Sequence, residues 1–292
     1  MRQVKFSQGF SPACEREIQP DYIGPVRSFD ELCQAFSLVH DRYAQLGYIE
    51  PKASGMRFGL LNLLPAAITF IAKSSNACLA TVTVVSNSPA GLPSEREFLR
   101  EYELLRVRRR KVAEATMFAC VADPAVFGAV FGILALGLMQ LVLKWCATEG
   151  IDDLCAVVNP KHVGFYTSTL GFKCLSAERA MPAVNGAPGV LLCLAVKNAL
   201  SGISEPPSKM PQNIARYFQG KSFANPFASP VYRLLETDVA FLLSLEPSVL
   251  PGTDYMQWYM LKHYYPRIVD LLFYKTHAPT NSAEEAKKQW LT

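Results

Sequence analysis

A single carboxylate lies inside an otherwise apolar stretch of this chain. Lys111 to Val121 reads KVAEATMFACV, a run typical of a buried strand, and Glu114 lies in its interior. A buried carboxylate is costly unless it is hydrogen-bonded, ion-paired or used in chemistry. Burial disfavours the charged form, so the pKa of Glu114 would rise and the residue could act as a general base near neutral pH. An ion pair with a nearby arginine is the structural alternative.

A second segment combines strand, helix and aromatic residues. Val157 to Phe172 reads VVNPKHVGFYTSTLGF. Pro160 suits the first turn of a helix, where its missing N–H is not needed, and Gly171 suits the left-handed position that ends one. Tyr166 on this helix could serve as an acid in the same site as Glu114. An ordinary strand–helix unit with aromatic residues in the core is the alternative.

Three further segments accompany these two in a fixed order. The five pieces are HDRYAQLGYIEP (His40 to Pro51), Gly55-Met56-Arg57, RKVAEATMFACVADP (Arg110 to Pro124), NPKHVGFYTSTLGF (Asn159 to Phe172) and VNGAPGVLLCL (Val184 to Leu194). In this order the chain resembles the long-chain N-acyl amino acid synthases of the N-acyl tyrosine synthase type, within the GNAT superfamily of acyltransferases. The resemblance implies an α/β (α+β) fold with a mixed, mostly antiparallel sheet, a central splayed parallel pair and flanking helices.

The resemblance also implies a reaction. A long-chain fatty acyl group would pass from the phosphopantetheine thioester of acyl carrier protein to the amino group of an amino acid or similar amine, without a covalent enzyme intermediate. Glu114 would be the general base and Tyr166 would protonate the thiolate. Backbone N–H groups near Phe118 and Ala119 would bind the oxyanion. We expect no tightly bound cofactor and no metal, because the acyl thioester (acyl-ACP or acyl-CoA) is itself a substrate.

The segment before the central helix departs from the acetyl-CoA-dependent GNAT pattern. Those proteins carry Arg/Gln-x-x-Gly-x-Gly/Ala, whose backbone N–H groups bind pyrophosphate. Here residues 123–130 read DPAVFGAV. The helix N-terminus that remains would favour one phosphate through its dipole. We therefore expect Phe127, Gly128 and Ala129, with Asn159, to bind phosphopantetheine, and a carrier protein fits better than CoA.

Arginines mark two further candidate sites. Arg57 could bind the acceptor carboxylate bidentately, with Tyr43 of the first helix beside it. The densest basic run contains Arg108, Arg109 and Arg110, which we predict to dock the acidic carrier protein. A solvated basic face is the alternative for this run.

Composition restricts the class of protein. The chain has 292 residues, 50% hydrophobic and 18% charged, with a net charge of +4, which fits neither a disordered nor a nucleic-acid-binding protein. Its eight cysteines are scattered singly, as in free thiols of a reducing compartment. We read no signal peptide and expect a cytoplasmic protein. Pro124 to Leu143 is uncharged and long enough to cross a bilayer. Its flanks read as halves of one domain, so we expect a buried helix.

The elements fall into four parts. These are an N-terminal arm (1–27), a GNAT-like domain (28–200), a Pro-rich linker (201–230) and a C-terminal helical extension (231–292). Ser-x-x-Glu capping boxes predict helices from Ser28 and over Ser94 to Arg109. The remaining predicted elements of the domain are a hairpin of Ala67 to Lys73 with Leu79 to Ser86, strands at 111–121, 154–158 and 190–196, and helices at 125–148 and 160–170.

Two other functions remain open from sequence. One is an acyl-homoserine lactone synthase-like enzyme, and the other is a non-catalytic protein that binds acyl groups or a carrier protein. The C-terminal extension could cover the apolar central helix, cap an acyl channel or mediate a homodimer. A peripheral membrane contact is equally open.

Overall fold

One mixed sheet organises the chain. The computed structural model describes residues 20–121, 128–203, 231–268 and 270–272. The main path of the sheet runs β1-β2-β3-β4-β5-β8-β6, and β7 pairs with β8. Of the described strand pairs β4–β5 is parallel and the others are antiparallel. The strands are β1 (Tyr22–Pro25), β2 (Ala67–Ser74), β3 (Ala77–Ser86), β4 (Val112–Cys120), β5 (Asp153–Val158), β6 (Lys173–Cys174), β7 (Arg179–Met181) and β8 (Ala187–Ala195).

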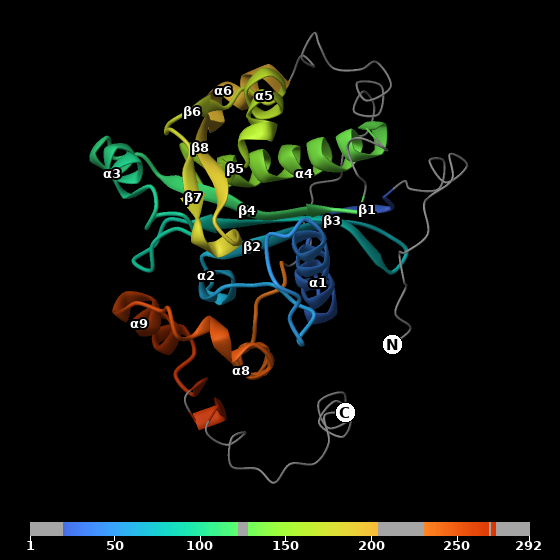
Figure 1. The fold of residues 1–292 in the computed structure, drawn as a ribbon, viewed down its shortest axis with the longest axis vertical. Helices are drawn as coiled ribbons and strands as arrows, with labels where there is room; N and C mark the ends of the chain where they lie inside the picture. Colours follow the sequence, from blue (N-terminus) through green and yellow to red (C-terminus); the bar gives the residue numbers. More distant parts are fainter. Residues whose placement is uncertain (1–19, 122–127, 204–230, 269, 273–292) are drawn as a thin grey trace.

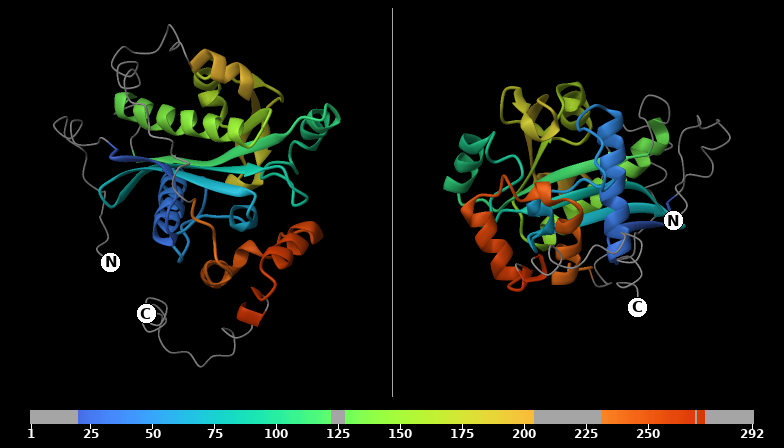
Figure 2. Two further views of the ribbon diagram at one scale, coloured as in Figure 1. Left: turned by 180° about the vertical axis from the view of Figure 1, so that it is seen from behind. Right: turned by 60° about the horizontal axis from the view of Figure 1, so that its bottom comes forward.

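Helices cover both faces of this sheet. One face carries α4 (Gly128–Thr148), α5 (Pro160–Thr169) and α6 (Val196–Ile203). The other carries α1 (Phe29–Gln45), α2 (Leu60–Leu63), α8 (Glu236–Leu245) and α9 (Tyr255–Tyr264), as Figures 1 and 2 show. A further helix, α3 (Leu99–Val107), packs on the sheet through a buried cluster that includes Tyr102 and Leu105. Two short 3-10 turns are η2 (Pro182–Val184) and η3 (Pro247–Val249). The predicted layered α/β class is confirmed.

Local sequence signals place several elements correctly. The hairpin β2–β3 turns at Ser75, whose φ of 52° lies in the left-handed region. Asn159 caps α5 by accepting a hydrogen bond from the Lys161 N–H (3.2 Å), and Pro160 opens the helix. Gly171 follows the helix with a φ of 78°, the conformation that glycine adopts without a Cβ clash.

Only one of the two hydrogen bonds of the first predicted capping box forms. Ser28 Oγ accepts the Glu31 N–H (3.2 Å), which starts α1 at Phe29. The Glu31 carboxylate accepts the Arg27 N–H (2.7 Å) instead of closing on Ser28, and it also pairs with Lys73 of β2 (2.8 Å). The cap is therefore part of an ion cluster that joins α1 to the sheet.

The second predicted capping box is wrong. We expected a helix from Ser94, but α3 begins at Leu99. The backbone N–H and hydroxyl of Ser94 both bind the Glu114 carboxylate, so this serine does not cap a helix. A tertiary partner has replaced the local one.

The predicted arm contains a strand that sequence did not reveal. Tyr22–Pro25 pairs antiparallel with Phe70 to Lys73 of β2. Four residues that include Gly24 and Pro25 carry no strand periodicity, and an edge strand tolerates proline because its N–H side need not pair. Residues 1–19 lie outside the described residues.

The apolar helix α4 packs on the sheet rather than standing alone. Leu134, Leu138, Leu141 and Val142 are fully or almost fully buried in the cluster that α4 shares with the strands. In the described ranges no helix has the length and apolar character needed to cross a bilayer. The predicted start of this helix falls on residues 122–127, which are not described.

The C-terminal helices cover the face opposite α4. Val239, Leu242 and Leu243 of α8 and Leu261 of α9 share one buried cluster with α1 and α2. Both helices cover the α1 face rather than the apolar central helix. Residues 204–230, which make up most of the predicted linker, lie outside the described residues. So do residues 273–292, the last part of the predicted extension.

Candidate active site

The parallel strands β4 and β5 separate halfway along their length. They pair over Val112 to Ala115 and Asp153 to Ala156. Beyond this point β4 continues alongside β3, whereas β5 continues alongside β8 through Val158. The predicted splayed pair is therefore present, and it leaves strand edges that do not pair with each other at the centre of the sheet.

A bulge distorts β4 just after the separation. Thr116 is opposite Thr83 and Ala119 is opposite Thr81, so Met117 and Phe118 together face the single residue between those threonines. Met117 has a φ of 57°, which is rare for a residue with a side chain. Such a bulge turns backbone groups out of the regular ladder. Of the two positions predicted for the oxyanion site, Phe118 lies in the bulge, whereas Ala119 has returned to the ladder.

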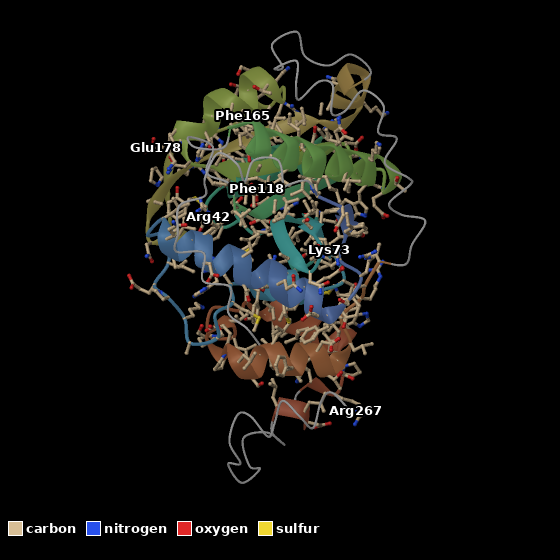
Figure 3. All side chains as sticks on the ribbon, turned by 90° about the vertical axis from the view of Figure 1, so that its right-hand side faces the viewer. Arg42, Lys73, Phe118, Phe165, Glu178 and Arg267 are labelled. Carbon is tan, nitrogen blue, oxygen red and sulfur yellow. The ribbon has the colours of Figure 1, made fainter. Side chains whose placement is uncertain are left out.

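A cavity of about 710 Å³ occupies the gap and is lined from both faces of the sheet. On one face α4 contributes apolar residues that include Leu138 and Met139, and α5 adds Phe165 together with polar residues such as Lys161. On the other face the wall includes Tyr43 of α1 and Val184 of η2. In Figure 3 three lining residues follow one another from top to bottom: Phe165 on α5, Phe118 in the sheet and Arg42 on α1.

Glu114 lies at the edge of this cavity and is only 2% exposed. Its Oε2 accepts hydrogen bonds from the Ser94 N–H (3.0 Å), the Ser94 hydroxyl (3.0 Å) and the Tyr102 hydroxyl (2.9 Å). These partners are neutral, so the ion-pair alternative is wrong for the described residues. Burial raises the pKa of Glu114 to about 7 and outweighs the hydrogen bonds from Ser94 and Tyr102, which act to lower it. Glu114 thus has the pKa of a base that works near neutral pH.

Sequence analysis missed Ser94 and Tyr102 as members of this site. Tyr102 is fully buried on α3, and burial together with the neighbouring Glu114 raises the pKa of its hydroxyl well above the usual value. It therefore stays protonated and can donate. One signal in the sequence could have indicated Tyr102: it lies on the apolar side of a charged helix. A tyrosine hydroxyl buried there needs a hydrogen-bond partner.

Tyr166 and Tyr43 meet across the cavity wall. Tyr166 packs against Phe165 and Phe172, with ring centroids 5.8 Å and 5.4 Å away. Burial raises the pKa of Tyr166 to about 12, and the nearby Tyr43 adds to this rise. Both tyrosines line the cavity. The structure thus brings a predicted catalytic residue and a predicted acceptor residue to one site.

Arg57, in the loop between α1 and α2, lies beside Tyr43 but does not itself line the cavity. Its guanidinium lies 5.6 Å from the centre of the Tyr43 ring, and Nη2 donates to the Ala183 carbonyl (2.5 Å). Nε is buried without a hydrogen-bond partner in the described structure. Burial lowers the pKa of this arginine, and it forms no ion pair with a carboxylate of the described residues. An unpaired, partly desolvated guanidinium is a strong anion-binding group.

The predicted phosphopantetheine residues are only partly described. Phe127 lies outside the described residues, and Gly128 and Ala129 open α4. Asn159 lines the cavity, but its side-chain oxygen caps α5. Its position at the cavity wall therefore already has a structural cause.

The three arginines predicted to dock a carrier protein differ in environment. Arg110 forms an ion pair with Asp153 of β5 and also donates to the Asp152 carbonyl (3.2 Å). Arg108 and Arg109 are exposed. All three precede β4, a strand about 27 Å long, so they lie at the opposite end of it from Cys120, after which the chain continues to α4. The structure does not bring this basic run to the predicted phosphate site.

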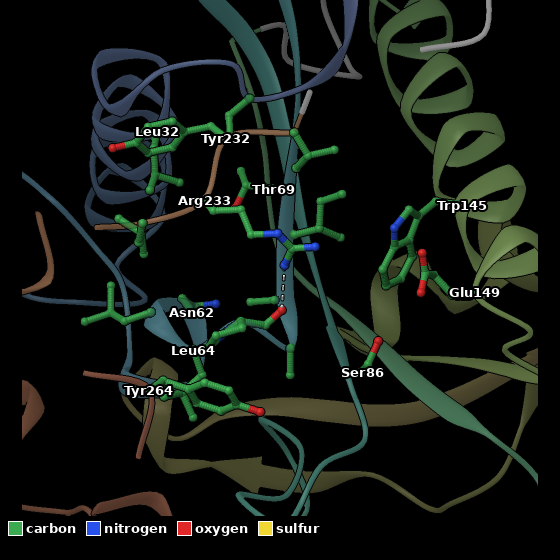
Figure 4. Close-up of a pocket in the computed structure, with 18 of the residues that line it drawn as sticks. Leu32, Asn62, Leu64, Thr69, Ser86, Trp145, Glu149, Tyr232, Arg233 and Tyr264 are labelled. Atoms are coloured by element: carbon green, nitrogen blue, oxygen red, sulfur yellow. Dashed lines mark hydrogen bonds between the residues drawn. The ribbon is translucent and has the colours of Figure 1, made fainter. Parts of the chain in front are cut away.

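A second cavity, of about 520 Å³, lies at the β2 edge of the sheet. Arg233 crosses it and donates to the Pro65 carbonyl (3.4 Å), while Trp145 of α4 and Glu149, just after this helix, face it from the other side (Figure 4). None of the residues predicted for catalysis or substrate binding lines it. In the described parts of the chain no three His, Cys, Asp or Glu side chains are grouped to hold a metal ion, and the seven described cysteines are free thiols.

The splayed strands, the bulge and the cavity define an acyltransferase of GNAT-like fold. The family model described as N-acyl amino acid synthase FeeM matches residues 34–195. The chain belongs to this family. No curated protein sequence matches it.

The chain is also similar to several solved structures. The structure of FeeM, an N-acyl amino acid synthase from uncultured soil microbes, is 27% identical, with a TM-score of 0.53. That match covers 63% of this chain and 96% of FeeM. A CoA-dependent acyl-homoserine lactone synthase, BjaI, is 16% identical over 64% of this chain and 90% of its own, with a TM-score of 0.46. A putative N-acetyltransferase from Lactobacillus plantarum is 11% identical over 60% and 97%, with a TM-score of 0.43.

Proposed function

We propose that this protein transfers a long-chain fatty acyl group from the phosphopantetheine thioester of acyl carrier protein to the amino group of an amino acid or similar amine. The observation that carries the proposal is Glu114, a buried carboxyl with a pKa of about 7 at the edge of the cavity between β4 and β5. Membership of the FeeM family supports the reaction class. FeeM itself is named as an N-acyl amino acid synthase.

Glu114 acts as the general base. The three hydrogen bonds that Glu114 accepts from Ser94 and Tyr102 all use Oε2. We therefore assign the incoming proton to Oε1. The bulge lies about four residues along β4, or about 13 Å at the usual rise per strand residue, so a chain of several water molecules in the cavity relays the proton. The neutral amine then attacks the thioester carbonyl, and the N–H groups at the bulge near Phe118 stabilise the oxyanion.

Every proton that leaves the acceptor in this reaction is accounted for. The ammonium of the acceptor loses two protons when it becomes an amide nitrogen. One proton converts the departing thiolate to a thiol, and the other is released to solvent. Protonated Glu114, with a pKa of about 7, can supply the thiolate because an ordinary thiol has a pKa of about 8.5.

Tyr166 assists the thiolate by donating a hydrogen bond. Its pKa of about 12 lies above that of an ordinary thiol at about 8.5, so complete proton transfer from tyrosine to thiolate is unfavourable. The phenol remains protonated throughout and stabilises the developing negative charge on sulfur. This replaces the role of proton donor that sequence suggested for Tyr166.

The two sides of the cavity suit two different substrates. The apolar side formed by α4 fits an acyl chain, and the N-terminus of α4 favours the single phosphate of phosphopantetheine. The opposite side offers Tyr43, with Arg57 beside it, for the carboxylate of the acceptor. The amine would thus approach the thioester from the α1 face.

Filling the apolar side is expected to weaken donor binding. Ala135 on α4 lines the cavity. Ala135→Phe should raise the KM for a long-chain acyl thioester about tenfold, because the added ring occupies the space of the chain. Ala147→Phe makes the same change at an exposed position of the same helix and serves as control. Equal KM values for the two variants would place the acyl chain elsewhere.

Docking of the carrier protein is tested at the exposed arginines. Arg108→Glu with Arg109→Glu should raise the KM for acyl carrier protein thioesters roughly tenfold, since like charges repel an acidic partner. An acyl-pantetheine donor lacks that partner, so its KM should not change. An unchanged KM for the carrier protein thioester would remove these arginines from docking.

One assay tests the function as a whole. The protein is incubated with acyl carrier protein thioesters of several chain lengths and a mixture of amino acids, and products are identified by mass spectrometry. An N-acyl amino acid supports the proposal. A lactone formed from S-adenosylmethionine would instead indicate an acyl-homoserine lactone synthase, and the absence of acylated product with every donor would contradict amide synthesis.

A further inference from the structure

The C-terminal extension contacts the loop that carries Arg57. Helices α8 and α9 and the turn η3 lie on the α1 face of the sheet (Figure 2). The family match ends at residue 195, so this extension is additional to the matched domain. Met56 and Phe58, on either side of Arg57, share a buried cluster with α8 and α9.

Glu246 makes the polar contacts between the two segments. It follows α8 directly, and its residue is 8% exposed. Its carboxylate accepts a hydrogen bond from the Ser54 hydroxyl (3.1 Å), pairs with Lys52 Nζ (3.2 Å) and also binds the Ser248 hydroxyl. Burial opposes the charged form, but the bonds from Ser248, Lys52 and Ser54 outweigh it and lower the pKa of Glu246.

The contact continues into the turn before Arg57. Ser54 Oγ accepts the Met56 N–H (3.3 Å) across Gly55, whose φ of 61° requires the left-handed conformation. A hydroxyl fixed by Glu246 thus fixes the turn. Arg57 follows at once, and its N–H donates to the Phe36 carbonyl of α1 (3.1 Å).

A second anchor holds the other end of the loop. His40 of α1 is buried, and its Nε2 accepts the Lys52 N–H (2.9 Å). Lys52 is therefore fixed through its backbone to α1 and through its side chain to Glu246. The path runs from the extension through Lys52 and Ser54 to Arg57, and from there to Tyr43 at the cavity wall.

We propose that Glu246 is a positioning residue for acceptor binding: through Lys52 and Ser54 the C-terminal extension holds the loop so that the Arg57 guanidinium lies beside Tyr43, which lines the cavity. The inference rests on the proposed function, because it assigns the acceptor carboxylate to Arg57. Glu246 itself touches no substrate. The extension thereby becomes part of acceptor recognition.

Two variants of the full-length protein separate positioning from general stability. Glu246→Gln removes the charge and keeps the size, and it should raise the KM for the amino acid acceptor about tenfold while kcat and the KM for the acyl donor stay unchanged. Glu236→Gln is the matched control, since Glu236 binds the Arg267 N–H within the extension. Ser54→Ala, a milder change, should raise the same KM by a smaller factor.

Hydrogen exchange supplies a readout that does not depend on activity. The amides of Lys52 and Arg57 are hydrogen-bonded to His40 and Phe36, and they should exchange faster in Glu246→Gln but not in Glu236→Gln. A double-mutant cycle completes the test. With Arg57→Ala already present, Glu246→Gln should add no further increase in the acceptor KM.

Failure of the inference and failure of the proposed function look different. If the wild type makes no N-acyl product, the proposed function fails, while the exchange of the loop amides still reports whether Glu246 holds the loop. If the wild type is active and Glu246→Gln leaves both the acceptor KM and the loop exchange unchanged, the positioning role is wrong. Additive effects with Arg57→Ala would also overturn it.

Discussion

Glu114→Gln is expected to lower kcat by about 10²–10⁴-fold and to leave the protein folded. Glutamine has the same shape and its amide oxygen can accept the bonds from Ser94 and Tyr102, but it cannot take a proton from the acceptor. The measurement is steady-state formation of the N-acyl product, with folding checked by circular dichroism. The loss should appear in kcat with little change in either KM, because the base acts in the chemical step.

An exposed glutamate on the neighbouring helix provides the control. Glu103 lies on the outer side of α3, one residue after Tyr102, and does not line the cavity. Glu103→Gln makes the same chemical change and should keep normal turnover. If Glu114→Gln also kept near-normal turnover, Glu114 would have no part in the mechanism.

The pH profile distinguishes loss of a base from loss of structure. Burial raises the pKa of Glu114 from its ordinary value of 4.5 to about 7, so the carboxylate is protonated below that pH and cannot accept a proton. For the wild type, kcat/KM should therefore fall about tenfold for each pH unit below about 7. Above this value it should level off. The residual activity of Glu114→Gln should lack this acidic limb, and a limb of the same midpoint in the variant would assign it to another group.

Arg57→Ala is expected to raise the KM for an amino acid acceptor by about 10–100-fold. The guanidinium beside Tyr43 has one carbonyl partner, the buried Nε has none in the described structure, and burial has already removed part of its water. In the proposed reaction, the carboxylate of the acceptor would supply the missing partner. Steady-state kinetics with varied acceptor and saturating donor measure the effect.

The substrate itself provides the control for Arg57. An amine with the same side chain and no carboxylate cannot use the guanidinium, so its KM should be equal for the wild type and Arg57→Ala. The preference of the wild type for the amino acid should disappear in the variant. If both acceptors lose affinity by the same factor, Arg57 acts by holding Ala183 and the cavity wall, and it does not bind the carboxylate.

Local signals in the sequence predicted many of the elements around the site. The cap at Ser28, the hairpin around Ser75 and the Asn159–Gly171 helix depend on residues within a few positions of each other, and each is present. The carboxylate inside β4 was visible for the same reason, since one polar residue interrupts an apolar run. The four-residue strand β1 and the one-turn helix α2 carried too few residues for a periodic pattern.

Long-range partners could not be predicted in this way. Ser94 has the sequence environment of a helix cap, yet its hydroxyl binds Glu114, twenty positions away. Arg57 reaches Ala183, which is 126 positions away. The bulge at Met117 arises because two residues of β4 lie opposite one residue of β3. No residue type in β4 predicts it.

The sequence by itself determined that this chain builds a layered α/β domain with a carboxylate in a central strand, because hydrophobic periodicity and capping act between near neighbours. The tertiary structure decided what that carboxylate can do. Its neutral partners and its burial, which bring the pKa to about 7, come from α3 and from packing across the sheet. The cavity beside it exists because β4 and β5 find different partners after Ala115 and Ala156. Both features depend on contacts between residues far apart in the chain, which a linear pattern does not specify.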